Sequence, residues 1–198
     1  DTEIPSELTV EIGGSYEDQQ DMFGDLIMLL AMIIILVYIV MASQFESFMS
    51  PFVIMFSIPF AFVGVFMGLW VTGTPLGTMG MIGILILMGI VVKNGIVLID
   101  YTILMRERGY SIAQASVIAA NSRLRPILMT TLTTVLGMIP MAIGQGEGSE
   151  MWRSLGMVVA WGLSISTLVT LVIIPTVYAS MASWQERRAE RKAAKANK

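Results

Sequence analysis

The chain has 198 residues, of which 55% are hydrophobic and only 14% charged, and its mean hydropathy is +0.75. A soluble domain of this size needs far more polar side chains on its surface, so the composition places the chain among membrane proteins. The sequence contains neither cysteine nor histidine, which excludes disulfide bonds, zinc sites built from these residues, and catalysis by Cys or His.

Charge is distributed unevenly along the chain, although the net charge is only −3. Residues 1–25 hold eight acidic and no basic side chains, whereas residues 185–198 hold six basic and two acidic ones. The chain starts at Asp1, without an initiator methionine or a signal-peptide pattern before the first apolar run. We therefore expect it to be a piece of a longer protein.

Residues 1–24 are predicted to end a soluble domain on the non-cytoplasmic side of a membrane. The stretch "LTVEIGGSYEDQQD" first alternates apolar and polar residues, as a strand does, and then breaks at Gly13 and Gly14. Ser15 and Asp18 can cap a helix that continues into the first membrane span. A strand directly above a membrane helix indicates that most of this domain lies outside the chain.

Residues 25–178 are predicted to form a transmembrane domain, because five segments approach the roughly 20 apolar residues that a spanning helix needs. These segments are residues 26–42, 51–71, 79–101, 126–143 and 155–177. Pro59, Pro140 and Pro175 lie inside or at the end of spans and predict kinks. Gly64 and Gly68 form a GxxxG pattern, which favours close helix packing.

Residues 102–125 form the long connection between the third and fourth spans. Ser111 and Gln114 have the spacing of a capping box and predict the start of a short helix. Apolar residues follow along one side of that helix: Ile112, Ala115 and Ala119. We therefore expect a separate helix that lies on the membrane surface.

The distribution of Lys and Arg sets the expected orientation. With five spans the two ends lie on opposite sides of the membrane. The tail, residues 179–198, holds six basic residues, and the 102–125 connection on the same side holds four arginines, whereas the opposite side has only Arg153. We therefore expect a cytoplasmic tail and an N-terminal end on the other side.

Lys93 and Asn94 interrupt the apolar run "GIVVKNGIVLID", about two-thirds of the way along the span 79–101. An uncompensated lysine near the centre of a membrane helix costs about 2.5 to 3.5 kcal/mol. Lys93 could extend toward the cytoplasmic interface, or it could form a buried ion pair on a proton or ion path. The polar neighbour, and Gly89 and Gly95, which leave room for another helix, favour the ion pair. No other span holds a carboxylate at depth, so its partner must come from outside this chain.

The stretch "RLRPILMTTLTT" is a second polar feature. Arg123 and Thr130 are seven residues apart and therefore share one helical face, and Pro126 lies at or near the first turn of the predicted span. Taken alone, Arg123 and Arg125 would be anchors at the cytoplasmic end, and Thr130 would be bonded to its own backbone. Together with Lys93 they predict a polar file from the cytoplasm to the lysine.

The motifs "GIVVKNGIVLIDY" and "RLRPILMTTLTTVLGMIPMAIGQGEGS" resemble those of resistance-nodulation-division (RND) transporters, in the hydrophobe/amphiphile multidrug efflux branch. The likeness covers essentially the whole chain and corresponds to the C-terminal half of such a protein. It implies an all-α polytopic membrane fold: five helices of a twelve-helix domain with two pseudo-symmetric halves, and a short remnant of a periplasmic α/β porter domain at residues 1–24.

The resemblance implies a drug/proton antiporter driven by the proton-motive force. The residues at the positions of the family's proton relay are Lys93, Asn94, Arg123 and Thr130. Their carboxylate partners would be two adjacent aspartates in the N-terminal half, and protonation of an aspartate would release the lysine and shift the helices. The pair Lys93-Asn94 argues for organic substrates, because the heavy-metal branch differs at the lysine position.

The resemblance also implies partners and a location. We expect a homotrimer in the bacterial inner membrane, in contact with its lipids, a periplasmic adaptor protein and an outer-membrane channel, that exports hydrophobic small molecules and confers antibiotic resistance. It implies no catalytic residue, so we expect no enzyme activity, no cofactor, no metal site and no nucleic-acid partner. Two alternatives stay open: a noncatalytic membrane scaffold, and an RND-type exporter of lipids or metals.

Overall fold

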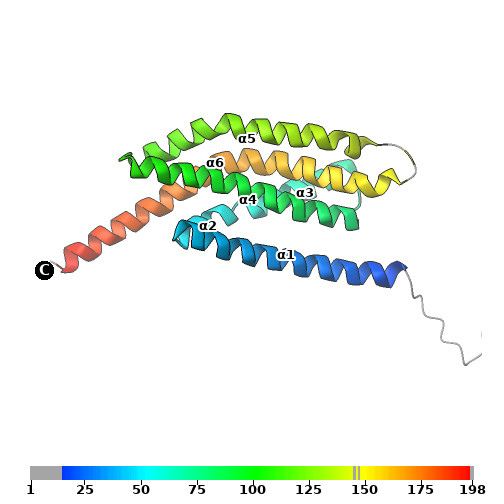
Figure 1. Cartoon of the computed structure of the whole chain (residues 1–198), viewed down its shortest axis with the longest axis horizontal. Helices are drawn as coiled ribbons and strands as arrows, with labels where there is room; N and C mark the ends of the chain where they lie inside the picture. Colours follow the sequence, from blue (N-terminus) through cyan, green and yellow to red (C-terminus); the bar gives the residue numbers. More distant parts are fainter. Residues whose placement is uncertain (1–14, 145, 147, 197–198) are drawn as a thin grey trace, which may run out of the picture.

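The computed structural model describes residues 15–144, 146 and 148–196, with side chains between residues 20 and 184. All secondary structure in these ranges is helical. The helices are α1 (Ser15–Phe45), α2 (Met49–Met55), α3 (Ile58–Thr72), α4 (Thr78–Glu107), α5 (Ile112–Ile143) and α6 (Ser149–Ala196). Figure 1 shows α1 along one edge of the bundle and α5 along the opposite edge. The predicted all-α fold is confirmed for these residues, whereas the strand predicted before Gly13 lies outside them.

Five helical segments of the described chain are long and apolar enough to cross a membrane. They are Gln20–Phe45, Met49–Thr72, Thr78–Glu107, Ile112–Ile143 and Ser149–Trp184. Each contains one of the five predicted spans and extends it at one or both ends. The sequence pattern marks only the apolar stretch, whereas a helix continues past that stretch for as long as its backbone hydrogen bonds continue.

The second span consists of two helices, α2 and α3, which are broken at Phe56 and Ser57. Pro59 has no N–H to donate to the carbonyl of Met55, so the hydrogen-bond ladder is interrupted there. Ser57 closes the turn, because its backbone N–H and its hydroxyl both donate to the carbonyl of Ile54, at 3.0 and 2.6 Å. The kink predicted from Pro59 is confirmed.

The capping box that starts α5 is confirmed. The hydroxyl of Ser111 accepts from the N–H of Gln114 at 3.4 Å, and the Gln114 side chain accepts from the N–H of Ser111 at 3.3 Å. The prediction of a separate surface helix within residues 102–125 is wrong, because α5 runs without a break from Ile112 to Ile143. Pro126 removes one backbone hydrogen bond, but α5 packs along α6 and α4, and that packing keeps the helix continuous.

The core is built around α6, which packs against α5, α4 and α3. Its contact with α3 passes through the predicted GxxxG pattern. A Cβ at Gly64 would stand 3.1 Å from the Cα of Gly162 and 3.1 Å from the carbonyl oxygen of Trp161, and a Cβ at Gly68 would overlap the Trp161 side chain. The two helices therefore approach almost to backbone contact, as the pattern predicted.

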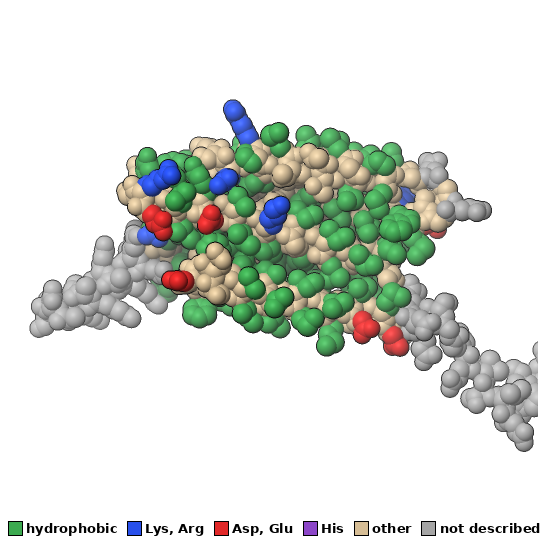
Figure 2. All heavy atoms as spheres, viewed as in Figure 1, with side chains coloured by type: hydrophobic (Ala, Val, Ile, Leu, Met, Phe, Trp, Pro, Cys, Tyr) green, Lys and Arg blue, Asp and Glu red, His purple; other side chains and the backbone are tan. Residues whose placement is uncertain are grey.

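The first helix, α1, is the least covered one, although it packs against α2 and α4. Many of its apolar side chains are exposed: Met22, Ile27, Met28, Leu29, Met32, Ile35, Leu36, Ile39 and Val40. Figure 2 shows apolar side chains over most of the visible face and most charged side chains toward its two ends. Such a distribution suits a surface that faces lipid or other membrane helices.

Candidate functional site

Lys93 lies on a face of α4 that no described helix covers. Its side chain is exposed, and at Gly89, one turn away on the same face, a Cβ would meet nothing within 4 Å. Gly95 faces the other way, since a Cβ there would stand 2.8 Å from Ile54 and 3.2 Å from Ile174. Of the two glycines expected to admit another helix, Gly95 therefore admits α2 and α6, and Gly89 leaves an open face beside the lysine.

A groove of about 600 Å³ between α4 and α5 brings together Lys93, Asn94 and Thr130. Its other lining residues are Ile90, Val97, Pro126, Ile127, Met129, Thr131, Thr133 and Thr134. Asn94 is buried, whereas Lys93 is exposed at the open side of α4. Lys93 forms no salt bridge with any residue that the structure describes. The groove therefore presents one ammonium, one amide and several hydroxyls, with no carboxylate among its lining residues.

The threonines of this groove are bonded to their own helix. The hydroxyl of Thr130 donates to the carbonyl oxygens of Pro126 and Ile127, at 3.1 and 2.9 Å, and Thr133 and Thr134 make equivalent bonds one turn back. The alternative prediction, that Thr130 is bonded to its own backbone, is therefore correct for the hydroxyl proton. Its oxygen retains acceptor capacity, so the residue can still accept a hydrogen bond from a group in the groove.

Arg123 does not line the groove. Its guanidinium carbon stands 4.7 Å from the centre of the Tyr101 ring, in a cation–π contact with the C-terminal part of α4. The Nε of Arg123 is buried and has no hydrogen-bond partner within the described residues. Tyr101 is eight residues beyond Lys93, which is about 12 Å along the helix axis. The structure therefore groups three of the four predicted site residues and places Arg123 apart from them.

One contact of the groove wall was not predicted from the sequence. The hydroxyls of Thr131 and Thr167 are 3.1 Å apart, and both side chains are buried. This hydrogen bond joins α5 to α6 behind the groove, and such bonds between membrane helices contribute about 0.6 to 2 kcal/mol. The run "MTTLTT" contains the signal, but one sequence does not tell which of its threonines faces α6.

Within the described residues, no group of three or more Asp, Glu, His or Cys side chains could hold a metal ion. The polar groups of the groove are an ammonium, an amide and hydroxyls. These groups can bind a carboxylate or pass a proton through hydrogen bonds, and they match no common metal-ligand set.

Comparison with known proteins identifies the family. The profile of the AcrB/AcrD/AcrF family matches residues 1–182. The chain belongs to this family. Members of the AcrB/AcrD/AcrF family are RND transporters, so the resemblance stated from the two motifs is confirmed.

Curated relatives in the family differ in what their names say. The swarming motility protein SwrC of Bacillus subtilis is 44% identical over 122 residues, which are 61% of this chain and 12% of that protein. The cobalt-zinc-cadmium resistance protein CzcA of Cupriavidus metallidurans is 41% identical over 110 residues, 56% of this chain and 10% of that protein. The multidrug resistance protein MdtC of Proteus mirabilis is 38% identical over 128 residues, 62% of this chain and 12% of that protein. The matched regions thus cover about one-tenth of these relatives.

Solved structures of a heavy metal efflux pump have the same helix arrangement. One crystal form matches with a TM-score of 0.77 and 30% sequence identity, over 90% of this chain and 18% of that chain. A second crystal form matches with a TM-score of 0.73 and 33% identity, over 84% of this chain and 17% of that chain. The described helices therefore correspond to part of the membrane domain of an RND transporter.

Proposed function

We propose that this chain works within a proton-driven efflux transporter, in which Lys93 forms one half of an ion pair that opens on protonation. The observation that carries the proposal is the open face of α4, where Lys93 stands in a polar groove beside an uncovered glycine. An ammonium at this depth in hydrocarbon is costly, so a carboxylate from a helix outside this chain would stabilise it. The AcrB/AcrD/AcrF match supports a transporter that contains such a helix.

The energy of this ion pair is of the right size to drive a conformational change. Two unit charges 4 Å apart attract by on the order of 4 kcal/mol at an effective dielectric constant near 20. Protonation of the carboxylate removes that attraction, and about 4 kcal/mol shifts a two-state equilibrium by nearly a thousandfold. Asn94 and the oxygen of Thr130 would accept hydrogen bonds from the ammonium when it is released. Arg123 would line the path that leads to the groove from the end of the bundle.

We further propose hydrophobic or amphiphilic organic compounds as the substrates, because the pair Lys93-Asn94 fits the drug-exporting branch of RND transporters. Metal export is the second candidate, favoured by the identity to CzcA and by the match to a heavy metal efflux pump. Under both proposals substrate selection would take place in parts of the transporter outside this chain.

Susceptibility tests separate these candidates. A complete transporter that carries this chain would be expressed in a pump-deficient bacterial host, with the Lys93→Ala variant as the inactive control. We expect the host to gain resistance to cationic dyes and detergents, and no resistance to cobalt, zinc or cadmium salts. Protection against the metal salts alone would support metal export. Protection against neither class would favour the noncatalytic scaffold.

We also propose the assembly and location that the RND resemblance implies. The transporter would be a homotrimer in the bacterial inner membrane, with a periplasmic adaptor and an outer-membrane channel as partners. The five apolar helices and the family match support a multi-pass inner-membrane protein. The basic tail and the arginines near the α4–α5 turn support a cytoplasmic position for that end of the bundle.

Cysteine labelling tests the orientation, and the absence of cysteine from this chain removes background reaction within it. Glu150 and Tyr110 are both exposed and lie beyond opposite ends of α5. In intact cells, an impermeant maleimide should label Glu150→Cys, whereas Tyr110→Cys should react only after the membrane is permeabilised. The reverse pattern would overturn the proposed orientation.

A further inference from the structure

The guanidinium of Arg123 contacts an aromatic ring rather than a carboxylate. Its carbon stands 4.7 Å from the centre of the Tyr101 ring, and no N–H group of Arg123 has an acceptor within the described residues. Asp100 precedes Tyr101 in the sequence and is exposed, yet it forms no salt bridge with Arg123. Within the described part of the chain, the ring therefore provides the specific contact that holds this cation.

The contact lies directly beyond one end of the lysine groove. Val97 of α4 and Ile127 of α5 both line the groove. Tyr101 is one turn beyond Val97, and Arg123 is one turn before Ile127. Because α4 and α5 run in opposite directions (Figure 1), both steps lead toward the α4–α5 turn. The positive charge therefore lies about one turn outside the groove, on the side that we propose to be cytoplasmic.

The position of this charge matters for the movement of protons. An arginine near a membrane boundary ordinarily extends its guanidinium into water, where the charge is hydrated and screened by salt. A ring contact between two helices keeps the charge beside the groove instead, where its effect on neighbouring groups is larger. A fixed positive charge stabilises the ionised form of a nearby carboxylate and so favours the release of its proton.

We propose that Tyr101 is a positioning residue of the proton path, whose ring holds Arg123 at the end of the groove so that the guanidinium favours proton release toward the cytoplasm. This role rests on the proposed function, since it concerns the same proton-driven export. The ring carries the role rather than the hydroxyl, because the hydroxyl of Tyr101 makes no hydrogen bond within the described residues.

Variants of Tyr101 in a complete transporter that carries this chain test the role of the ring. Tyr101→Phe keeps an aromatic face and should export a fluorescent dye at a rate within about twofold of the unaltered transporter. Tyr101→Leu keeps apolar bulk without the ring and should lower the rate about threefold to thirtyfold, the factor to which cation–π energies correspond. Equal export by Tyr101→Leu and Tyr101→Phe, at equal expression, would overturn the proposal.

A double-mutant cycle with Arg123→Gln separates the contact from simple packing of the tyrosine. If the ring acts through Arg123, then Tyr101→Leu should lower export no further in a transporter that already carries Arg123→Gln. Independent packing predicts that the two effects add, and additive effects would contradict the proposal. If Arg123→Gln abolishes export, the same cycle is read from the thermal midpoints of unfolding in detergent, where the two changes should again not add.

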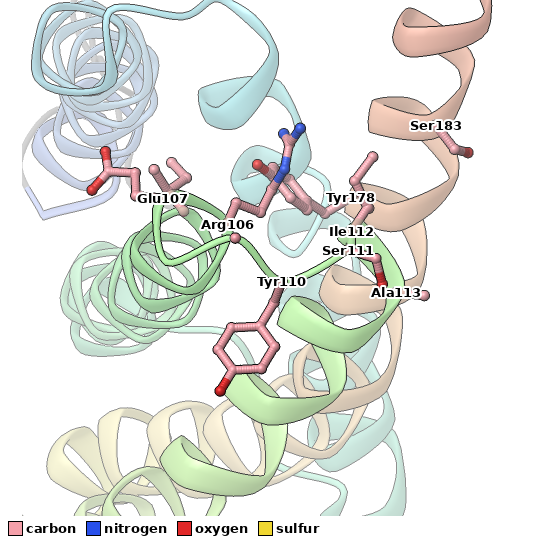
Figure 3. Close-up of a pocket in the computed structure, with 10 residues that line it drawn as sticks. Arg106, Glu107, Tyr110, Ser111, Ile112, Ala113, Tyr178 and Ser183 are labelled. Atoms are coloured by element: carbon pink, nitrogen blue, oxygen red, sulfur yellow. The ribbon is translucent and has the colours of Figure 1, made fainter.

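Two controls accompany this series. Figure 3 shows the ring of Tyr110, at the same end of the bundle, pointing away from the Arg106 guanidinium. Tyr110→Leu should therefore leave export unchanged, and a loss equal to that of Tyr101→Leu would overturn the specific role of Tyr101. Lys93→Ala tests the proposed function separately. Normal export by Lys93→Ala would reject the ion pair, whereas normal export by Tyr101→Leu alone would reject only the role of the ring.

Discussion

Replacing Lys93 by alanine in a complete transporter that carries this chain is expected to reduce proton-coupled export by about a hundredfold or more, while the protein still inserts into the membrane. The substitution removes the ammonium that would bind and release the carboxylate, and it also removes an intramembrane charge, so insertion should not suffer. Efflux of a fluorescent dye from energised cells gives the rate, and immunoblotting of membrane fractions gives the expression level.

Two further variants separate the ion pair from an interface anchor. Lys93→Arg should also export poorly, because a planar guanidinium does not replace a compact ammonium between carboxylates. Thr130→Ala should be milder, because the proton of that hydroxyl is already bonded to the helix backbone and a water can replace its oxygen. A lysine that only extends to the interface gives the opposite order, with Arg tolerated and Ala neutral. Near-normal export by Lys93→Ala would disprove the proposed mechanism.

Replacing Gly64 by valine is expected to destabilise the membrane domain by about 1 to 3 kcal/mol, because the new side chain has no space between α3 and α6. The first atom added would already stand 3.1 Å from two backbone atoms of α6, at Gly162 and Trp161, and neither can move without shifting the helix. The temperature midpoint of unfolding in detergent, followed by the fluorescence of a size-exclusion peak, should fall.

The matched control for this variant is Gly137→Val in α5. A Cβ at Gly137 meets nothing within 4 Å among the described residues, so the same substitution should change the midpoint much less. Equal effects at the two positions would mean that valine acts through helix propensity alone. In that case the close contact between α3 and α6 would contribute nothing measurable to stability.

The features that a single sequence predicted well are the local ones. The five spans follow from apolar length, the start of α5 from the Ser111–Gln114 spacing, and the break before α3 from the missing N–H of Pro59. Each depends on residues of one continuous segment, and the last two depend on residues within one or two turns of each other. The predicted spans are shorter than the observed helices. A helix can continue through polar residues beyond its apolar stretch, and the sequence pattern does not mark where it then ends.

Apart from the close contact of α3 and α6 at Gly64 and Gly68, the features that depend on packing between helices were not predicted. Pro126 was expected to start a span, but α6 and α4 support α5 on both sides of it, and the helix continues. The hydrogen bond between Thr131 and Thr167 depends on the rotation of two helices about their axes. Arg123 shares a helical face with Thr130, yet it turns to Tyr101 on a neighbouring helix rather than into the groove.

The lysine groove was only partly predictable for a related reason. The sequence identified Lys93, Asn94 and Thr130 as polar groups at compatible depths, and the structure places all three in one groove. It also shows that the open face extends to Gly89, where a further helix could approach closely. The carboxylate that completes the proposed pair belongs to a part of the transporter outside this chain, so neither its identity nor its distance follows from these residues.

The most direct test of the proposed ion pair is an experimental structure of a complete transporter that carries this chain, solved at a pH where carboxylates are ionised. We expect the Nζ of Lys93 to lie within about 4 Å of a carboxylate oxygen from a helix that packs on the open face of α4. A Lys93 side chain that instead extends along α4 to the aqueous boundary, with no carboxylate near its nitrogen, would contradict the account.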